Sequence, residues 1–334
     1  MNLRTIWTAP WAALLGIVLR IRHAAYDCGV FATFRFNTPS MVIGNLSLGG
    51  TGKSPMVQHL IHSAPKDLKI AVLTRGYGRK TKGLWHAKLG DGPHELGDEA
   101  ADLRRKFPDV ALVCSASRVA GMRFLEHHIK PDLVLLDDAF QHRSLVPHAH
   151  ILLTTWNKPY HRDHLFPWGS LRDIRSAAQR AEVIIVTKSP DFPDQSTQKQ
   201  WRAAMKVQKG QSLLFAQLSY ISTVSGPLGT RTLADLLLQN PVLFTGIADP
   251  APLVEHLKSL GWNGEHRSFN DHHSYSASDF QTLGGRCVLT TEKDSVKWHG
   301  LYENWYAVGV THLMDEPGSI LLKNMLLSLV GRAN

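Results

Sequence analysis

The sequence predicts an α/β protein built on a mostly parallel sheet. The apolar run Met41–Ile43 leads into a glycine-rich turn that ends in Lys53 and Ser54, and a segment with helix potential follows. A second apolar run ends in the paired carboxylates Asp137 and Asp138. Runs of strand length alternate with helix-length segments along most of the chain. This alternation favours a parallel sheet covered by helices.

The first thirty residues are expected to form a helix at a membrane interface. Ile6–Leu19 is almost wholly apolar, and a basic cluster follows at 20–23. The run is shorter than the roughly 20 residues that cross a bilayer. A secretory signal would end in a small-residue cleavage site instead of a basic cluster. Trp7 and Trp11 suit the interface. A helix buried against the core is the alternative.

Residues 41–55, MVIGNLSLGGTGKSP, have the order of strand, glycine turn and helix that a phosphate-binding loop requires. Glycines let backbone N–H groups converge on an anion at the positive end of the next helix. We expect Lys53 to reach the β- and γ-phosphates of a nucleotide and the Ser54 hydroxyl to be a Mg²⁺ ligand. Ser47 stands where the usual loop has its first glycine, so the loop is a variant. The expected nucleotide contacts are Asn45, Ser47, Gly49, Gly50, Thr51, Gly52, Lys53 and Ser54. An unliganded glycine-rich turn is the alternative.

The next strand is expected at 69–74 and ends in the loop Arg75-Gly-Tyr-Gly-Arg79. Loops at the carboxyl ends of parallel strands line the ligand crevice, so both arginines are placed to meet anions, although a solvated loop would carry them equally well. A helix follows from Asp98 to Phe107. On the sequence alone, Asp98 and Glu99 are best explained as carboxylates that cap this helix.

The run at 131–138, PDLVLLDD, resembles a Walker B element. Such a strand is buried, and its end faces the same crevice as the phosphate loop. Asp137 and Asp138 would hold Mg²⁺ directly or through water. A surface turn is the alternative for these two residues.

We expect three parts in the chain: an N-terminal helix over 1–30, a P-loop NTPase-like core over 31–150, and a smaller α/β C-terminal domain over 151–310. About 311–334 returns to complete the core. Strands at 151–156 and 305–310 are expected to pair as a two-stranded hinge. The smaller domain is expected to hold strands at 183–187, 212–218, 242–246 and 288–291 and helices at 196–206, 233–238 and 250–260. His272 and His273 are adjacent, and neighbours on an extended chain point to opposite faces, so they would not share a metal ion.

Composition limits the partners. The 334 residues are 43% hydrophobic and 19% charged, as in ordinary globular proteins. The net charge of +9 favours anionic partners such as phosphorylated substrates or an acidic membrane surface. No Lys/Arg block reaches the length of a nucleic-acid-binding tail, so no nucleic acid partner is expected. The three cysteines, Cys28, Cys114 and Cys287, lie far apart, which favours a reducing compartment.

Together these motifs resemble the tetraacyldisaccharide 4′-kinases, the lipid A 4′-kinase family of Gram-negative bacteria. The shared stretches are GNLSLGGTGKSP at 44–55, TRGYGR at 74–79, GDEA at 97–100, SASR at 115–118, LLDDAFQHR at 135–143, DHH at 271–273 and TTEKD at 290–294. Ser54 stands where the family usually has threonine, which keeps the hydroxyl. The stretch from Gly169 through Arg172 and Asp173 departs from the family's Gly-Pro-Leu-Arg-Glu-Pro.

The resemblance implies an ATP- and Mg²⁺-dependent kinase that phosphorylates the 4′-hydroxyl of a tetraacylated glucosamine disaccharide 1-phosphate. It makes Asp98 the base for the sugar hydroxyl, with His272 as its partner, and so reverses the capping interpretation. Lys53 and Arg118 join these two as catalytic residues, Arg118 as a charge stabiliser or a substrate anchor. The implied metal contacts are Ser54, Glu99, Asp137 and Asp138.

The resemblance also implies where the protein acts in the cell and which residues bind its substrate. Arg75, His142 and Arg143 are the candidates for the lipid's 1-phosphate. The family is associated with the cytoplasmic face of the bacterial inner membrane, which fits the apolar and basic N-terminus. We expect a monomer. Thr187, Lys188 and Lys293 are the candidates for contacts with adenine.

Two rival hypotheses stay open on the sequence. Another deviant P-loop protein, such as a GTPase-type metal chaperone or a small-molecule ligase, would share the phosphate loop. Thr187-Lys188 and Thr291–Asp294 could each be mistaken for a guanine-reading motif, but neither is Asn-Lys-x-Asp. A non-enzymatic basic scaffold that binds a membrane or nucleic acid is the second rival, and it predicts that Asp98→Ala leaves function intact.

Overall fold

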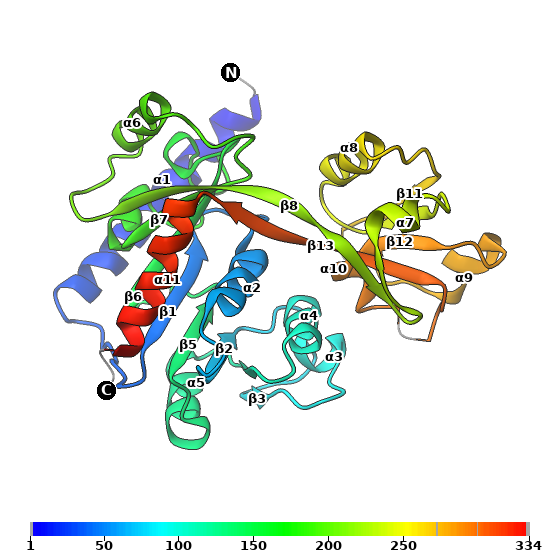
Figure 1. The fold of residues 1–334 in the computed structure, drawn as a ribbon. Coiled ribbons are helices and arrows are strands. Elements are labelled where there is room, and N and C mark those ends of the chain that lie inside the picture. The colour runs from blue at the N-terminus through cyan, green and yellow to red at the C-terminus, as the bar shows by residue number, and fades with distance from the viewer. Residues whose placement is uncertain (1–2, 272, 299, 332–334) are drawn as a thin grey trace.

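A computed structural model describes residues 3–271, 273–298 and 300–331 and shows two lobes joined by two long strands (Figure 1). Among these residues, one 13-stranded sheet runs through both lobes in the order β11-β10-β12-β13-β8-β7-β6-β1-β5-β2-β4-β3, with β9 paired to β8. The larger lobe holds the phosphate loop. The mixed α/β class with a mostly parallel sheet is therefore confirmed.

The larger lobe is built around β1 (Ser40–Asn45), which lies between β5 (Leu133–Asp137) and β6 (Ala149–Thr155). The remaining strands are β2 (Ile70–Thr74), β4 (Ala111–Cys114), β7 (Val183–Thr187) and the first part of β8 (Ser212–Gly226), all parallel, with β3 (Trp85–His86) as an antiparallel edge. Parallel pairing places the carboxyl ends of β1, β2 and β5 at one edge of the sheet, where the phosphate loop begins.

Helices cover both faces of this half of the sheet. On one face, α2 (Lys53–Ser63), α4 (Asp98–Lys106) and α11 (Glu316–Gly331) bury apolar side chains in a single cluster with the strands. On the other face lie α5 (Arg118–Phe124), which continues as a π-helical turn over Leu125–Ile129, and α6 (Gln195–Ala204). The return of the last helix to the core was predicted, and α11 packs beside α2. Short helices complete the larger lobe at α3 (Pro93–Leu96), Tyr160–Arg162 and Arg175–Arg180.

The hinge strands differ from the predicted ones. The connection is made by β8 and β13 (Trp305–Met314), which pair antiparallel from Ala307↔Ser225 to Met314↔Ala216. The expected pairing of 151–156 with 305–310 is wrong, because that segment forms β6 between β1 and β7. β6 is buried almost throughout, as a central parallel strand covered on both faces must be. The predicted boundary at residue 150 therefore cuts through the larger lobe, which also contains β7 and α6.

The smaller lobe packs short elements around two apolar clusters. Its elements are β9 (Gly229–Thr232), α7 (Leu233–Leu237), β10 (Val242–Thr245), α8 (Ala251–Ser259), β11 (His266–Ser268), α9 (Ala277–Phe280), a 3₁₀ turn at Gln281–Leu283, β12 (Val288–Thr291) and α10 (Glu292–Ser295). β12 runs parallel to the first part of β13, which carries the sheet from one lobe to the other.

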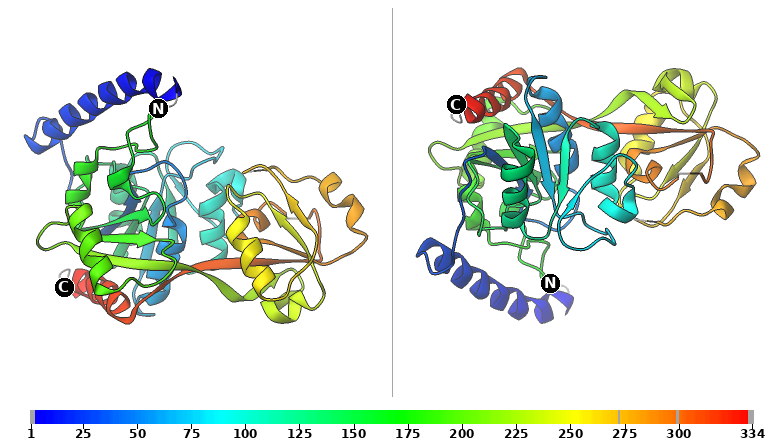
Figure 2. Two further views of the ribbon diagram at one scale, coloured as in Figure 1. Left: turned by 90° about the horizontal axis from the view of Figure 1, so that it is seen from above. Right: turned by 90° about the horizontal axis from the view of Figure 1, so that it is seen from below.

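The first helix, α1 (Leu3–Asp27), lies along the outside of the larger lobe (Figure 2). Its outer face leaves large apolar side chains in solvent: Trp7 is 76% exposed, Trp11 66% and Ile21 65%. The helix is therefore not buried on all sides: Ala12 and His23 are buried on its inner face against the larger lobe, and its outer face stays exposed. No helix within the described residues is long and apolar enough to cross a membrane.

Candidate active site

The phosphate loop joins the end of β1 to the start of α2. Gly49 and Gly52 have φ values of 105° and 84°, in the left-handed region that glycine adopts without strain. There is also no room for a side chain at Gly52, since a Cβ there would lie 2.7 Å from Nε2 of His312. α2 begins at Lys53, so its unpaired N–H groups face the loop. The loop therefore has the conformation that an anion-binding turn requires.

Three side chains support the loop through hydrogen bonds to Thr51 and Gly52. Asn45 Nδ2 donates to Thr51 Oγ1 at 2.8 Å, Thr187 Oγ1 donates to Thr51 O at 2.9 Å, and His312 Nε2 lies 2.9 Å from Gly52 O. Thr187 is fully buried, and its Oγ1 also lies 3.1 Å from Thr154 O. The suggestion that Thr187 contacts adenine is thus wrong, because its hydroxyl supports the loop.

Asp138 faces Lys53 across the crevice. Lys53 Nζ lies 3.7 Å from Asp138 Oδ1, and Arg172 Nη1 donates to Asp138 Oδ2 at 3.0 Å. A second guanidinium nitrogen of Arg172 contacts both Asp138 Oδ1 and Asn45 Oδ1. Burial opposes ionisation of Asp138, but the Arg172 hydrogen bond and the Lys53 charge outweigh it and lower the pKa of this carboxyl. Asp138 is therefore an anion at neutral pH.

Asp137 has the opposite environment. Its side chain is buried, and Thr74 Oγ1 donates to Asp137 Oδ2 at 3.1 Å. Burial, reinforced by the negative charge of Glu99, raises the pKa of Asp137 to about 7. Within the described part of the chain, Asp137 Oδ1 is buried with no hydrogen-bond partner. A buried carboxylate oxygen of this kind is suited to a cation.

The start of α4 brings two more carboxylates to the loop. Ser54 Oγ donates to Glu99 Oε2 at 2.9 Å, and Asp98 Oδ2 lies 3.0 Å from Lys297 Nζ of the smaller lobe. Gly97, with φ 84°, precedes them, and a Cβ at Gly97 would lie 2.1 Å from Tyr77 O. The turn after β2 thus packs on the start of α4. His272, the expected partner of Asp98, lies outside the described residues.

Arg118 lies beneath the carboxylates. It is only 1% exposed, and its guanidinium donates to Ser115 O at 2.6 Å and to Asp137 O at 3.2 Å. These contacts join the carboxyl ends of β4 and β5. The predicted role of Arg118 as a substrate anchor is not supported by this position, because its guanidinium donates to backbone carbonyls and does not reach solvent. Arg118 instead shapes the site from within.

The three basic residues predicted to bind the 1-phosphate are not all brought together. Arg75 is exposed at the end of β2 and lies close enough to His142 to influence its charge. Burial, with the positive charges of Arg118 and Arg75, lowers the pKa of His142 to about 4. Arg143 is used differently, since its guanidinium contacts His23 and Asp27 of α1.

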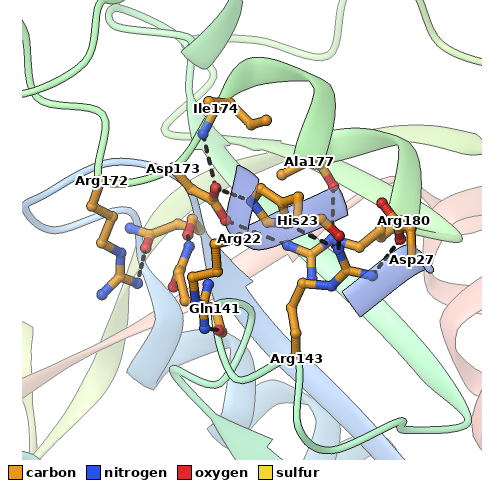
Figure 3. A network of polar contacts seen from close by, with 11 residues as sticks. Arg22, His23, Asp27, Gln141, Arg143, Arg172, Asp173, Ile174, Ala177 and Arg180 are labelled. Carbon is orange, nitrogen blue, oxygen red and sulfur yellow. Dashed lines mark hydrogen bonds and ion pairs between the residues drawn. The ribbon is translucent and has the colours of Figure 1, made fainter. Parts of the chain in front are cut away.

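A polar network attaches α1 to this edge of the larger lobe (Figure 3). His23 Nε2 lies 2.6 Å from Asp173 Oδ1, and Arg180 also pairs with Asp173 at 3.4 Å. Arg22 donates to Gln141 O at 2.9 Å, and Gln141 Nε2 donates to Asn45 O at 2.9 Å. Asp173, which lies in the stretch that departs from the family motif, therefore holds α1 in place.

Pairing between the loop and the stretch at 170–172 explains why sequence reasoning missed Arg172. Leu48 N donates to Ser170 O and Arg172 N to Leu46 O, each at 2.7 Å. This pairing places Arg172 beside Asp138. The only signal in the sequence was the similarity of that stretch to a family motif. The other missed residues, His312 and Lys297, lie on segments with no motif of their own.

The fold and this edge of the sheet define a P-loop phosphotransferase, in which Lys53 and two carboxylates face the turn that receives phosphates. Residues 4–327 match the family described as Tetraacyldisaccharide-1-P 4′-kinase (LpxK). The chain therefore belongs to the tetraacyldisaccharide 4′-kinase family, the kinases that phosphorylate the 4′ position in lipid A biosynthesis, and the resemblance drawn from the motifs is confirmed. Membership of a kinase family removes the chaperone and scaffold hypotheses.

Individual relatives agree over nearly the full length. The tetraacyldisaccharide 4′-kinase of Flavobacterium johnsoniae is 36% identical over 302 residues, which cover 89% of this chain and 88% of the relative. That of Cytophaga hutchinsonii is 34% identical over 342 residues, covering 97% and 96%. The crystal structure of LpxK from Aquifex aeolicus in complex with ATP superposes with a TM-score of 0.81 at 29% identity, covering 96% of this chain and 98% of that one.

Proposed function

We propose that this protein transfers the γ-phosphoryl group of ATP to the 4′-hydroxyl of a tetraacylated glucosamine disaccharide 1-phosphate at the cytoplasmic face of the inner membrane. The observation that carries the proposal is the placement of Lys53, Asp138 and the start of α4 around one phosphate-binding turn. ATP is proposed because the structural neighbour from Aquifex aeolicus was solved with ATP.

The residues at the loop fit a magnesium ion. Ser54, Glu99 and Asp137 offer the hard oxygen donors that Mg²⁺ prefers, and Asp137 Oδ1 is buried without a partner among the described residues. No group of three or more His, Cys, Asp or Glu side chains close enough for one metal is found in that part of the chain. One or two carboxylates suffice when nucleotide phosphates complete the shell. Bound there, Mg²⁺ would neutralise charge on the phosphate oxygens.

In the proposed reaction the carboxylate of Asp98 accepts the proton of the 4′-hydroxyl. The sugar oxygen forms a bond to the γ-phosphorus as the bond from that phosphorus to the β–γ bridging oxygen breaks, and ADP leaves. Lys53 and the backbone N–H groups of the loop balance charge on the phosphates. A positioned base of this kind contributes about 10²- to 10⁴-fold to the rate. His272 is proposed as the partner of Asp98.

The lipid substrate explains the outer face of α1. Trp7, Trp11 and Ile21 would enter the interface of the membrane from which an acylated substrate does not leave. A net charge of +9 favours an anionic leaflet. Arg75 and His142 are proposed to meet the 1-phosphate, since they lie next to the carboxyl end of β5. We propose that the protein acts as a monomer.

The test is transfer of labelled phosphate from ATP to a lipid A disaccharide 1-phosphate in detergent micelles with and without Mg²⁺. Wild type is compared with Lys53→Ala, Asp98→Ala and the control Lys66→Ala, an exposed lysine after α2. Product that requires Mg²⁺, disappears in the first two variants and persists in the control supports the proposal. A folded wild-type protein that binds ATP but forms no product would contradict the assignment of the acceptor.

A further inference from the structure

Two ion pairs join helix α4 to the segment 292–297 of the smaller lobe. In one pair α4 supplies the anion, and in the other it supplies the cation. Asp98 at the start of α4 lies 3.0 Å from Lys297 Nζ, and Lys106 at its end contacts Glu292. The helix thus has an anion at its N-terminus and a cation at its C-terminus. The facing segment runs in the opposite direction, so that Lys297 meets Asp98 and Glu292 meets Lys106. This arrangement fixes how the smaller lobe sits on α4.

The Lys297 end of this contact is rigid. Lys297 N donates to Asp294 O at 3.0 Å, and its Nζ lies 3.4 Å from His273 O. Asp294 is itself fully buried, where its Oδ2 accepts from Thr291 Oγ1 at 2.7 Å and from Gly246 N at 3.0 Å. The side chains of Lys297 and Asp98 are 12% and 21% exposed. An ion pair so shielded from water is stronger than one on the surface.

The Lys106 end is packed against the hinge. Lys106 Nζ also forms an ion pair with Asp102 Oδ2 at 3.0 Å and donates to Gln58 Oε1 at 2.8 Å. A Cβ at Gly309, where the pairing of β13 with β8 changes register, would lie 2.6 Å from the Glu292 carboxylate. This end therefore anchors the lobes to each other without touching the phosphate loop.

We propose that Lys297 is a positioning residue for Asp98, through which the smaller lobe completes the phosphoryl-transfer site of the larger lobe. The inference rests on the proposed role of Asp98 as the base. The ammonium group holds one carboxylate oxygen, Oδ2, in a fixed place at the start of α4, one residue before Glu99, whose own carboxylate accepts from Ser54. The N-terminus of α4 adds a favourable field for the same carboxylate. Lys106 and Glu292 dock the lobes, whereas Lys297 orients the group that accepts the proton.

Because the two ion pairs sit at opposite ends of α4, they supply a matched control. Lys106 follows Asp98 by eight positions, which is about 12 Å along a helix at 1.5 Å per residue. Lys297→Met and Glu292→Gln each remove one charge of the smaller lobe from the same interface. Only Lys297→Met removes a contact of Asp98. A difference between these variants therefore separates orientation of Asp98 from docking of the lobes.

The experiment measures kcat and both KM values of the full-length protein with ATP, Mg²⁺ and the lipid substrate in micelles. We expect Lys297→Met to lower kcat by about 10- to 100-fold, as misplacement of a catalytic group does, with the KM for ATP changed less than about 2-fold. Lys297→Arg should recover most of kcat. Propylammonium added to Lys297→Ala should restore part of it, which also tests the idea if Lys297→Met does not fold.

A double-mutant comparison decides whether Lys297 acts through Asp98. Asp98→Asn with Lys297→Met should be no slower than Asp98→Asn alone. Equal losses in Lys297→Met and Glu292→Gln, or multiplied losses in the double variant, would overturn the inference. Full activity of Asp98→Asn would refute the proposed base and the inference together. An inactive Asp98→Asn beside a fully active Lys297→Met would refute the inference alone.

Discussion

His312 Nε2 lies 2.9 Å from the carbonyl oxygen of Gly52 and so joins β13 directly to the phosphate loop. His312 is only 2% exposed. Burial is the main cause that lowers the pKa of His312 to about 4, so the imidazole is neutral at pH 7 and its Nε2–H donates to the loop. β13 continues into the smaller lobe, where it pairs with β12. The loop that receives phosphates is thereby supported by the strand that connects the lobes.

Replacing His312 should weaken ATP binding. His312→Ala removes the donor to Gly52 O and leaves a space beside the loop. The KM for ATP is therefore expected to rise about 3- to 10-fold, which corresponds to the loss of one hydrogen bond. His312→Gln keeps an amide donor and should lie closer to wild type. Calorimetric titration of ATP into each variant checks the order. Unchanged affinity in His312→Ala would mean that the loop holds its shape without this contact.

The same histidine should make stability depend on pH. The pKa of an unfolded histidine is about 6.5, whereas burial lowers the pKa of His312 in the folded protein to about 4. The unfolded state therefore binds more protons between these values, and the His312 contribution to stability, present above about pH 6.5, is lost as the pH falls toward 4. Urea unfolding from pH 7 to pH 4.5 should show a smaller decline for His312→Gln than for wild type. His94→Gln, with its side chain 73% exposed, is the control.

The phosphate site was largely predictable from sequence because it is local. A strand, a glycine turn and Lys53 lie within a few residues of one another, and Asp138 ends the neighbouring strand. The structure brings Lys53 and Asp138 to 3.7 Å. Glu99, which lies 2.9 Å from Ser54 at the start of α4, was placed at the site only by the family resemblance. Parallel strands have their carboxyl ends at one edge of the sheet, so two correctly recognised strands suffice for this prediction.

The hinge was not predictable in the same way. Periodicity indicates a strand but not its partner, and the segment at 212–218 gave no sign that it continues to Gly226 as one long strand. The exposed part of β8 lacks the apolar run that marked its beginning. Likewise Arg172 reaches Asp138 through pairing of two loops, and His312 reaches Gly52 across 260 residues. Contacts of this range depend on topology.

Arg172 should be required for the geometry of Asp138. Its planar guanidinium contacts both Asp138 oxygens and Asn45, which a lysine cannot reproduce. We expect Arg172→Lys to lower kcat/KM by about 10-fold or more, the effect of losing a partly buried, charge-assisted hydrogen bond. Steady-state kinetics compare it with Arg202→Lys, a conservative change at an exposed arginine of α6. Equal kcat/KM values for the two variants would contradict a role for Arg172 at the site.

The outer face of α1 should carry membrane affinity independently of nucleotide binding. Trp7→Ser with Trp11→Ser removes two indoles that are 76% and 66% exposed, and each contributes on the order of 1 to 3 kcal/mol when buried in an interface. Sedimentation with vesicles containing anionic phospholipid should therefore show at least about 10-fold weaker binding. ATP binding should be unchanged, because neither tryptophan touches the loop.

The matched control for this prediction lies in the other lobe. Leu238→Ser replaces an apolar side chain that is 86% exposed but distant from α1, so vesicle binding should stay at the wild-type level. A general loss of surface hydrophobicity would weaken both variants alike. If the protein binds membranes through the outer face of α1, only the tryptophan variant should lose affinity for vesicles. That variant should also show a raised KM for lipid presented in vesicles. Vesicle binding that survives loss of both tryptophans would assign membrane contact to a different surface.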